Sequence, residues 1–282
     1  MILIYLIALA VLLAASYTDL KTREVPDWLN YALIAVGFGV AAVMAVSEWS
    51  FLPVAHSVAG FAVMSAIGYF MYYTGQWGGA DSKLLMGLGA LFGIELSVSS
   101  FMATFIVNFL AVSVVYGLCW SVYLAVKNWG KFAKVMDREL EKWRLLRFAV
   151  LAVSVALIPV VFFTPDFYVK AMLVSMVVII VATFYVWIFA HAVEKSSMLR
   201  FVSPEKLTVG DWIAEDVVVS GKRIAGPKDL GVEAAQIKQL ISLKRRGKIR
   251  KVLLKEGIPF VPSFLLAFIV SYFVGNLFLL LL

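Results

Sequence analysis

Long apolar segments alternate with short polar connectors over most of the chain. Segments long and apolar enough to cross about 30 Å of hydrocarbon as helices lie near 2–19, 29–47, 52–74, 83–98, 101–126, 147–163, 167–192 and 260–282. The fourth and sixth segments are short, and Pro159 interrupts the sixth, so either is compatible with a tilted, kinked or re-entrant helix. The pattern predicts an all-α polytopic membrane protein with about seven or eight transmembrane helices.

Residues 196–258 break this hydrophobic rhythm. Their first half contains β-branched runs separated by Gly210 and Gly221, which predict short strands. A helix that stops near Gly247 and a returning strand at 249–257 are expected to follow. The expected organisation is therefore a transmembrane core at 1–195, a small cytosolic α+β insert at 196–258 and a final transmembrane helix at 259–282.

The connector 127–147 is amphipathic. Its large apolar side chains recur at helical intervals among basic residues: Trp129, Phe132, Met136, Leu140 and Trp143. This arrangement predicts an interfacial helix that is anchored to anionic lipid headgroups, with a specific lipid or protein site as the alternative.

Composition and charge support a membrane protein. Hydrophobic residues make up 62% of the 282 residues, charged residues 15%, and the mean hydropathy is +0.93. The net charge of +7 raises the question of nucleic acid, but basic residues that flank membrane spans explain it equally well. If the N-terminus lies outside, all Lys and Arg residues except Lys170 fall on the cytoplasmic side. We therefore expect a multi-pass protein of the cell membrane with lipids as partners and no nucleic acid.

Cysteine and histidine residues offer no metal site. Cys119 is the single cysteine and lies in an apolar run, so we expect a buried, inert thiol and no intrachain disulfide. His56 and His191 each lack a partner at metal-ligand spacing. The sequence therefore calls for no metal and no cofactor.

Two aspartates are the candidate chemistry. Asp19 closes the first apolar segment and Asp81 opens the fourth, which places both at the cytoplasmic ends of spans in the proposed topology. Two carboxyl groups that approach each other in a low dielectric cannot easily both ionise, so one keeps a proton. Such a pair can activate water and polarise a carbonyl, as in aspartic proteases.

An ordinary structural interpretation competes with this one. Asp81 can be a helix cap, and Asp19 can be an interfacial acid that pairs with Lys21 or Arg23. Gly78 and Gly79 would then form a turn. In the catalytic interpretation, the same glycines are expected to adopt unusual backbone angles and to allow another chain segment to approach closely.

Two motifs carry a family resemblance. Asp19 is followed by Val25-Pro26-Asp27, and Asp81 lies within Gly78-Gly79-Ala80-Asp81-Ser82-Lys83-Leu84. Over roughly residues 1–115 these motifs resemble the type IV prepilin peptidase and archaeal preflagellin peptidase family, the membrane aspartyl proteases with a G-x-G-D signature. The chain departs from that signature in having Ala80 at its third position.

A third motif is similar to the proline-containing element that opens a late helix in these peptidases. It reads Ile258-Pro259-Phe260-Val261-Pro262. Pro259 and Pro262 lack backbone donors, which would leave carbonyls free to pair with a substrate strand, or they simply start a helix well.

The resemblance implies a membrane aspartyl endopeptidase that removes the short basic leader of prepilin-like or preflagellin-like proteins at the cytoplasmic membrane face. Its substrates would carry class III signal peptides. Asp19 and Asp81 would be the catalytic pair. The motif or supporting residues would be Gly78, Gly79, Ala80, Lys83, Pro26, Asp27, Pro259 and Pro262.

Three alternatives remain open. A presenilin-like protease uses the same chemistry but should hold both acids inside its spans. A transporter or channel could use membrane-edge carboxylates as ion sites. A catalytically inactive scaffold could bind partners through its insert.

Overall fold

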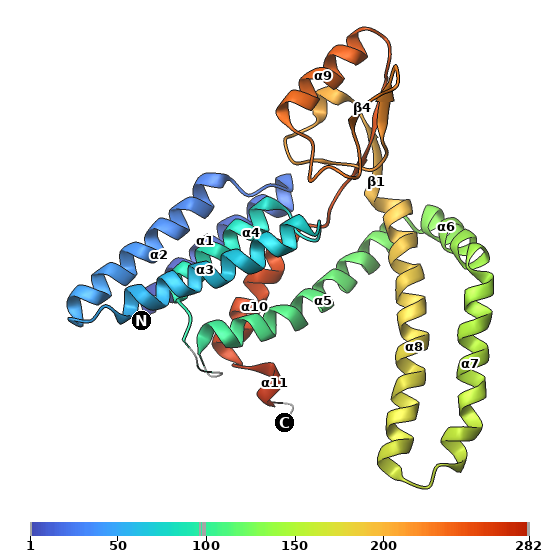
Figure 1. Ribbon diagram of the computed structural model, residues 1–282, viewed down its shortest axis with the longest axis horizontal. Helices are drawn as coiled ribbons and strands as arrows, with labels where there is room; N and C mark the ends of the chain where they lie inside the picture. The colour runs from blue at the N-terminus through green and yellow to red at the C-terminus, as the bar shows by residue number, and fades with distance from the viewer. Residues whose placement is uncertain (1, 96, 98–99, 281–282) are drawn as a thin grey trace. The chain divides into compact units, whose positions relative to one another are not determined.

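The computed structural model describes residues 2–95, 97 and 100–280. The chain divides into two compact units, one formed by Met1–Cys119 and Val202–Leu282 and the other by Trp120–Phe201. Figure 1 shows the order of the elements along the chain. Each unit is described separately below.

Six helices of the described residues are long and apolar enough to cross a membrane. They are α1 (Ile2–Thr22), α2 (Asp27–Ser47), α3 (Leu52–Tyr73), α5 (Phe101–Lys127), α7 (Arg144–Phe163) and a sixth segment, Phe167–Met198, that contains α8 (Phe167–Val193) and the π-helical turn η1 (Glu194–Met198). The prediction of a polytopic helical membrane protein with a small sheet-containing insert is confirmed.

Two of the predicted spans are shorter than expected. The fourth is α4 (Gly79–Phe92), and the last is α10 (Val261–Phe273) followed by α11 (Leu277–Leu280). The 14 residues of α4 extend only about 21 Å, less than the hydrocarbon thickness. Positions 96 and 98 of the predicted fourth span and 281 and 282 of the predicted last span lie outside the described residues. Leu84 to Leu91 are all buried, so α4 is enclosed by protein rather than by lipid.

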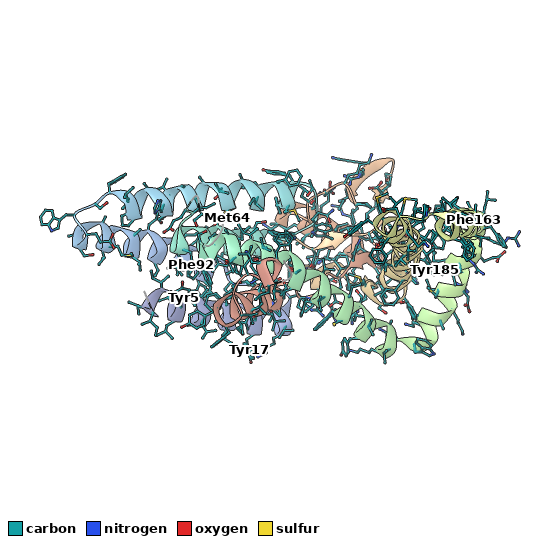
Figure 2. All side chains as sticks on the ribbon, turned by 90° about the horizontal axis from the view of Figure 1, so that it is seen from below. Tyr5, Tyr17, Met64, Phe92, Phe163 and Tyr185 are labelled. Carbon is teal, nitrogen blue, oxygen red and sulfur yellow. The ribbon has the colours of Figure 1, made fainter. Side chains whose placement is uncertain are left out.

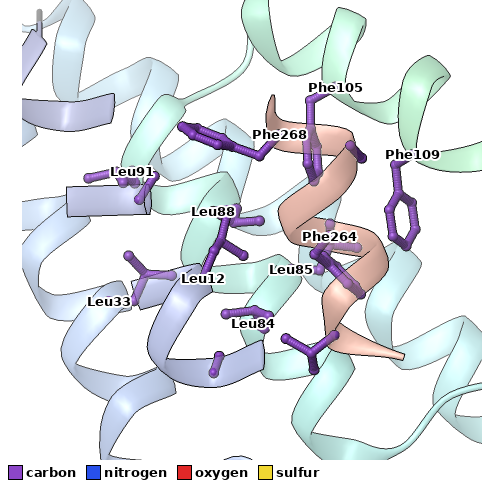
Figure 3. Packing of buried hydrophobic residues seen from close by; sticks show 14 of the residues in the cluster. Leu12, Leu33, Leu84, Leu85, Leu88, Leu91, Phe105, Phe109, Phe264 and Phe268 are labelled. Atoms are coloured by element: carbon purple, nitrogen blue, oxygen red, sulfur yellow. The ribbon is translucent and has the colours of Figure 1, made fainter. Parts of the chain in front are cut away.

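The core of the first unit lies where α1, α4, α5 and α10 meet. Phe105 and Phe264 are its largest fully buried side chains, and Phe264 packs against Phe109 with a ring centroid distance of 4.3 Å. Figure 3 shows these rings from α5 and α10 beside leucines of α1, α2 and α4. Farther along, Tyr5 and Phe92 bring α1 and α4 together (Figure 2), with ring centroids 5.4 Å apart. This core fixes the helices that carry both candidate aspartates.

Small residues allow α3 and α4 to approach closely. The residues of α3 that are buried are Ser57, Gly60, Met64 and Gly68, which recur every three or four positions on one face. A Cβ added at Gly60 would lie 2.3 Å from the carbonyl oxygen of Gly89 on α4. The Ser57 hydroxyl donates to the Ala90 carbonyl at 2.5 Å. In lipid the hydrophobic effect contributes little to the association of helices. Close packing at small residues and hydrogen bonds between helices hold them together instead.

The insert contains the predicted short elements. After the turn η2 (Pro204–Lys206), its strands are β2 (Trp212–Ile213), β3 (Val217–Val219), β4 (Lys222–Ala225) and β5 (Val252–Lys255), and its helix is α9 (Ala234–Arg245). Strands β3 and β4 pair antiparallel around Gly221, and β2 pairs antiparallel with β5. Leu240 of α9 and Val232 are fully buried in a separate small core with Ile213 and Val252.

The second unit is a helical hairpin with an additional amphipathic helix. Helices α7 and α8 pack along each other (Figure 1), and α6 (Trp129–Lys142) precedes them within the connector that was predicted to be helical. Phe132 of α6 packs against Phe189 of α8 at 5.6 Å between ring centroids. The strand β1 (Leu199–Val202) follows η1. The placement of α6 at a membrane surface stays a prediction.

One expectation about a side chain was wrong. Cys119, near the end of the first unit's part of α5, is exposed and not buried. An apolar run indicates that a segment lies in nonpolar surroundings. It does not show which side of the helix packs against protein and which side is exposed to lipid, so the burial of Cys119 could not be read from it.

Candidate active site

Asp19 lies in the last turn of α1 and reaches the start of a helix far away in sequence. Its Oδ2 accepts a hydrogen bond from the Val261 amide at the N-terminus of α10, at 2.9 Å. The side chain is buried, with 7% of the residue exposed. The positive end of the α10 dipole stabilises negative charge at this position. Asp19 is therefore a buried acid whose hydrogen bond joins the end of α1 to the start of α10.

The neighbouring Arg23 holds the same segment from another direction. Its backbone, at φ 62°, ends α1, and its Nη1 donates to the Gly257 carbonyl at 3.0 Å. Gly257 lies four residues before Val261. Two contacts thus fix the segment that leads into α10 against the end of α1.

Asp81 is the third residue of α4 and is half-buried. Its Oδ2 accepts a hydrogen bond from the Gly78 amide at 3.1 Å, which satisfies one of the free donors at the helix start. The capping role that competed with catalysis is therefore present in the structure. Among the described residues, the other oxygen, Oδ1, has no hydrogen-bond partner, so it is available to water or a substrate.

The expectation about Gly78 and Gly79 was wrong. Gly78 has an extended backbone with φ −72°, which any residue can adopt. A Cβ at Gly79 would make only an ordinary contact with the Tyr72 ring, at 3.8 Å. The left-handed position of this connector is instead Gly75, with φ 69°. A glycine pair in a sequence does not show which glycine the backbone turn requires.

The two aspartates interact electrostatically. The charge of Asp19 acts on the carboxyl group of Asp81, and it also acts on Tyr116 of α5. The end of α1, the start of α4 and the middle of α5 therefore lie near the start of α10. A neighbouring like charge disfavours ionisation of both carboxyl groups at once.

The proline motif at 258–262 has a structural role in this neighbourhood. The Tyr116 hydroxyl donates to the Pro259 carbonyl at 2.8 Å, so this carbonyl already has a partner. Pro262 lies in the first turn of α10, where a missing amide donor costs nothing. Of the two interpretations of this motif, helix initiation agrees with the geometry.

Lys83 and Asp27 bind each other. Lys83 Nζ lies 2.6 Å from Asp27 Oδ1, and it also lies over the Tyr31 ring at 5.3 Å. Asp27 is the first residue of α2, directly after Pro26. The ion pair joins the Val25-Pro26-Asp27 motif, which follows Asp19, to the motif that contains Asp81. Because both side chains are partly exposed, its stabilisation is modest, about 1 kcal/mol or less.

Sequence reasoning missed Tyr116 and Trp77. Tyr116 is one polar group within a long apolar run, and nothing in its spacing distinguishes it from a packing residue. Trp77 precedes the glycines and packs against Phe109, Phe260 and Phe264 at 5.6 to 5.9 Å between ring centroids. A tryptophan in the connector before Asp81 is visible in the sequence as a candidate packing residue. The sequence does not show its partners, because they lie on α5 and around the start of α10.

These features define a multi-pass helical membrane protein with a pair of interacting carboxyl groups at the ends of its helices. Residues 6–126, which include Asp19 and Asp81, match the model of the type IV leader peptidase family.

Curated relatives agree with this assignment. The chain is 38% identical over 87 residues to a preflagellin peptidase of Methanococcus voltae, a stretch that covers 31% of this chain and 37% of the relative. It is 40% identical over 80 residues to a preflagellin peptidase of Methanocaldococcus jannaschii, covering 28% and 34%. It is 32% identical over 98 residues to the prepilin peptidase EppA of Methanothermobacter thermautotrophicus, covering 34% and 25%. The chain thus matches only about a quarter to a third of the length of these relatives.

Proposed function

We propose that this protein is a membrane aspartyl endopeptidase that removes the short basic leader of prepilin-like or preflagellin-like proteins. The observation that carries the proposal is that Asp19 and Asp81, both within the range that matches the leader peptidase family, each accept a hydrogen bond from a backbone amide at the start of a helix. The names of the relatives, preflagellin peptidase and prepilin peptidase, indicate the substrate class.

The hydrogen bonds around the two carboxyls suggest their roles. Asp19 accepts from the Val261 amide and lies near the positive charge of Arg23, whereas Asp81 accepts from the Gly78 amide and has no such cation acting on it among the described residues. Hydrogen bonds from backbone amides favour an ionised carboxylate. Asp19 is therefore the proposed base, and Asp81 is the proposed acid that retains the shared proton.

The reaction follows from this assignment. Asp19 takes a proton from a water molecule whose oxygen attacks the scissile carbonyl carbon, and Asp81 gives its proton to the carbonyl oxygen. The resulting tetrahedral intermediate collapses when Asp19 donates its proton to the leaving nitrogen. Asp81 at the same time recovers a proton from one hydroxyl of the intermediate. Both residues return to their starting states.

The decisive experiment compares three asparagine variants. Asp19→Asn and Asp81→Asn are each expected to lower cleavage of a prepilin-like substrate by roughly 10³-fold or more, because either loss removes the shared proton cycle. Asp137→Asn, an exposed acid on α6, is the matched control and should cleave normally. Cleavage is followed by the mobility shift of the substrate, and folding by size-exclusion chromatography in detergent. Substantial turnover by either of the first two variants would contradict the assignment.

A cytoplasmic active site is part of the proposal. It is supported by the basic residues, of which all but Lys170 lie on one side in the topology derived above. In a Cys119→Ser background, Ser220→Cys in the insert should react with a membrane-impermeant thiol reagent only after cells are opened. Trp49→Cys, between α2 and α3, should react in intact cells. The reverse pattern would place the acids outside.

The insert is proposed to position the active-site connectors without supplying catalytic groups. The Trp212 ring of β2 lies 3.3 Å from the place where a Cβ would stand at Gly75, in the connector before Asp81. Nearby, the Tyr72 hydroxyl donates to the Leu230 carbonyl at 3.4 Å. At its other end the insert continues from β5 into the segment that Arg23 and Asp19 hold. The insert therefore contacts the connector that precedes α4 and, through Gly257, the residue that follows α1.

The position of the acids argues against the alternatives. Asp19 lies three residues before the end of α1, and Asp81 is the third residue of α4. A presenilin-like protease is expected to hold both acids inside its spans. For a transporter, further acids within spans are expected, but Glu48, Glu95 and Asp166 all lie outside the helices.

A further inference from the structure

The second unit contains a groove with no role in the proposed reaction. It lies between α7 and α8, has a volume of about 470 Å³ and is almost entirely apolar. Its lining residues are Leu146, Val150, Ile179, Ile180, Thr183, Phe184 and Trp187. A groove of this kind between two apolar helices fits a hydrocarbon chain.

Polar groups continue the same face of the hairpin beyond one end of the groove. Glu139, Trp143 and Arg147 follow each other at intervals of four residues across the junction of α6 and α7, where the Trp143 amide donates to the Glu139 carbonyl and the Arg147 amide to the Trp143 carbonyl. Arg147 is next to Leu146 and three residues before Val150, two of the groove residues. The Trp143 ring contacts the ring of Trp187, also a groove residue, at 4.9 Å between centroids. The polar stripe and the groove are therefore continuous.

Three polar atoms of this stripe are buried and lack a partner among the described residues. They are the Trp143 Nε1, the Arg147 Nε and the Glu139 Oε2. The other carboxylate oxygen of Glu139 binds Lys195 Nζ at 2.6 Å, so the acid itself is neutralised. Only 5% of Glu139 is exposed. Buried polar groups normally have partners, because leaving one unsatisfied costs about 1–3 kcal/mol.

The chemistry of these atoms is that of a lipid headgroup site. Two N–H donors, one of them on an arginine that forms no ion pair within the described chain, match the oxygens of a phosphate diester. Lys142, over the Trp143 ring at 5.3 Å, adds positive charge. The free Glu139 oxygen can accept from a hydroxyl or ammonium group on the headgroup. An interfacial position for α6 would bring this cluster to the depth of lipid phosphates.

We propose that α6, α7 and α8 form a specific site for one membrane phospholipid, with an acyl chain in the α7–α8 groove and the phosphate held by Trp143 and Arg147. The occupant is a lipid and not free phosphate, because the donors adjoin an apolar groove that can bind a hydrocarbon chain but offers nothing to free phosphate. The site is independent of the aspartates and does not rest on the proposed function.

Native mass spectrometry of the full-length protein in detergent tests the site. The probes are dioleoyl phosphatidylglycerol and dioleoylglycerol, which share their chains but differ in the phosphate headgroup. The wild type is expected to retain the phospholipid at least tenfold more strongly than dioleoylglycerol, since hydrogen bonds to a charged group are the stronger ones. Excess inorganic phosphate should not displace it. Equal retention of the two probes, or displacement by phosphate, would overturn the proposal.

Variants separate this site from general attraction of basic residues to anionic lipid. Arg147→Gln is expected to weaken retention of the phospholipid about tenfold, and Trp143→Phe, which keeps the ring but removes the N–H, a few-fold. Arg144→Gln is the control, because Arg144 pairs with the exposed Glu141 at 3.4 Å. It should change retention little.

Trp143→Phe also serves as a control for misfolding, because it preserves the aromatic contact with Trp187. If Arg147→Gln and Arg144→Gln weakened retention equally, or if Trp143→Phe bound as the wild type does, headgroup recognition at this site would be refuted.

Discussion

The close approach of α3 and α4 gives a prediction about stability. Gly60→Ala places a methyl group where a Cβ would lie 2.3 Å from the Gly89 carbonyl oxygen and 2.7 Å from the Gly93 carbonyl carbon. Both neighbours are backbone atoms, which cannot rotate away as a side chain can. The helices must separate by roughly 1 Å to reach an ordinary contact distance.

The expected magnitude combines two opposing effects. Overpacking of a tight interface costs about 1–3 kcal/mol, and the upper end applies where backbone must move. Alanine within a helix recovers up to about 1 kcal/mol relative to glycine. Gly39→Ala on α2 isolates the second effect, because a Cβ there meets nothing within 4 Å. The two alanine variants should therefore differ in free energy of unfolding by about 1–3 kcal/mol, with Gly60→Ala the less stable.

Unfolding in mixed micelles, titrated with SDS and followed by circular dichroism, measures this difference. Because α4 carries Asp81, Gly60→Ala should also lower cleavage at temperatures where the protein is still folded. If Gly60→Ala proved as stable as Gly39→Ala, the two helices would not be packed as closely as described, and the reasoning would fail.

Three further predictions concern the site and the insert. Asp27→Asn removes the ion pair with Lys83 and should reduce cleavage only a few-fold in steady-state assays; complete inactivity would make Asp27 part of the catalytic pair. Trp212→Ala should lower kcat or raise KM several-fold while Trp212→Phe retains most activity, and equal activity of both would remove the positioning role. The hydrogen bond from Lys244 lowers the pKa of Glu205 from 4.5 to about 2, so its stabilisation is present above pH 4.5 and is lost as pH falls towards 2. Lys244→Met should therefore make the stability of the insert depend less on pH between 4.5 and 2, as measured by circular dichroism during acid titration.

The sequence predicted the long helices because hydrophobic length is a local property. It also located the short strands of the insert, where Gly221 separates two β-branched runs, and β5. It did not distinguish α4 from a lipid-facing span, since hydropathy cannot tell lipid from protein surroundings. The small residues Gly87 and Gly89 were the available signal, because they suit a helix that packs on several sides.

The sequence predicted which aspartates belong to the candidate site, but not the residues that contact them. Both aspartates stand in recognisable motifs, and their action as a pair stays a prediction. The partners of those aspartates were not predictable, because no periodicity connects Asp19 with Val261. Asp27 and Lys83 were expected to help position a leader, a role that stays a prediction, but their binding to each other was not foreseen. Pairwise contacts of this kind depend on tertiary packing.

The hydrogen bond between Asp19 and Val261 has a consequence for biosynthesis. The two residues are 242 positions apart, so during translation the carboxylate leaves the ribosome long before its amide partner has been made. At a synthesis rate of roughly 5–20 residues per second, this interval lasts on the order of ten seconds or more. Throughout it, α1 is already available for insertion while its acid still lacks the helix end that stabilises the negative charge. The nascent chain therefore stays unfinished, and Asp19 gains its partner at the start of α10 only when the segment containing α10 joins the bundle.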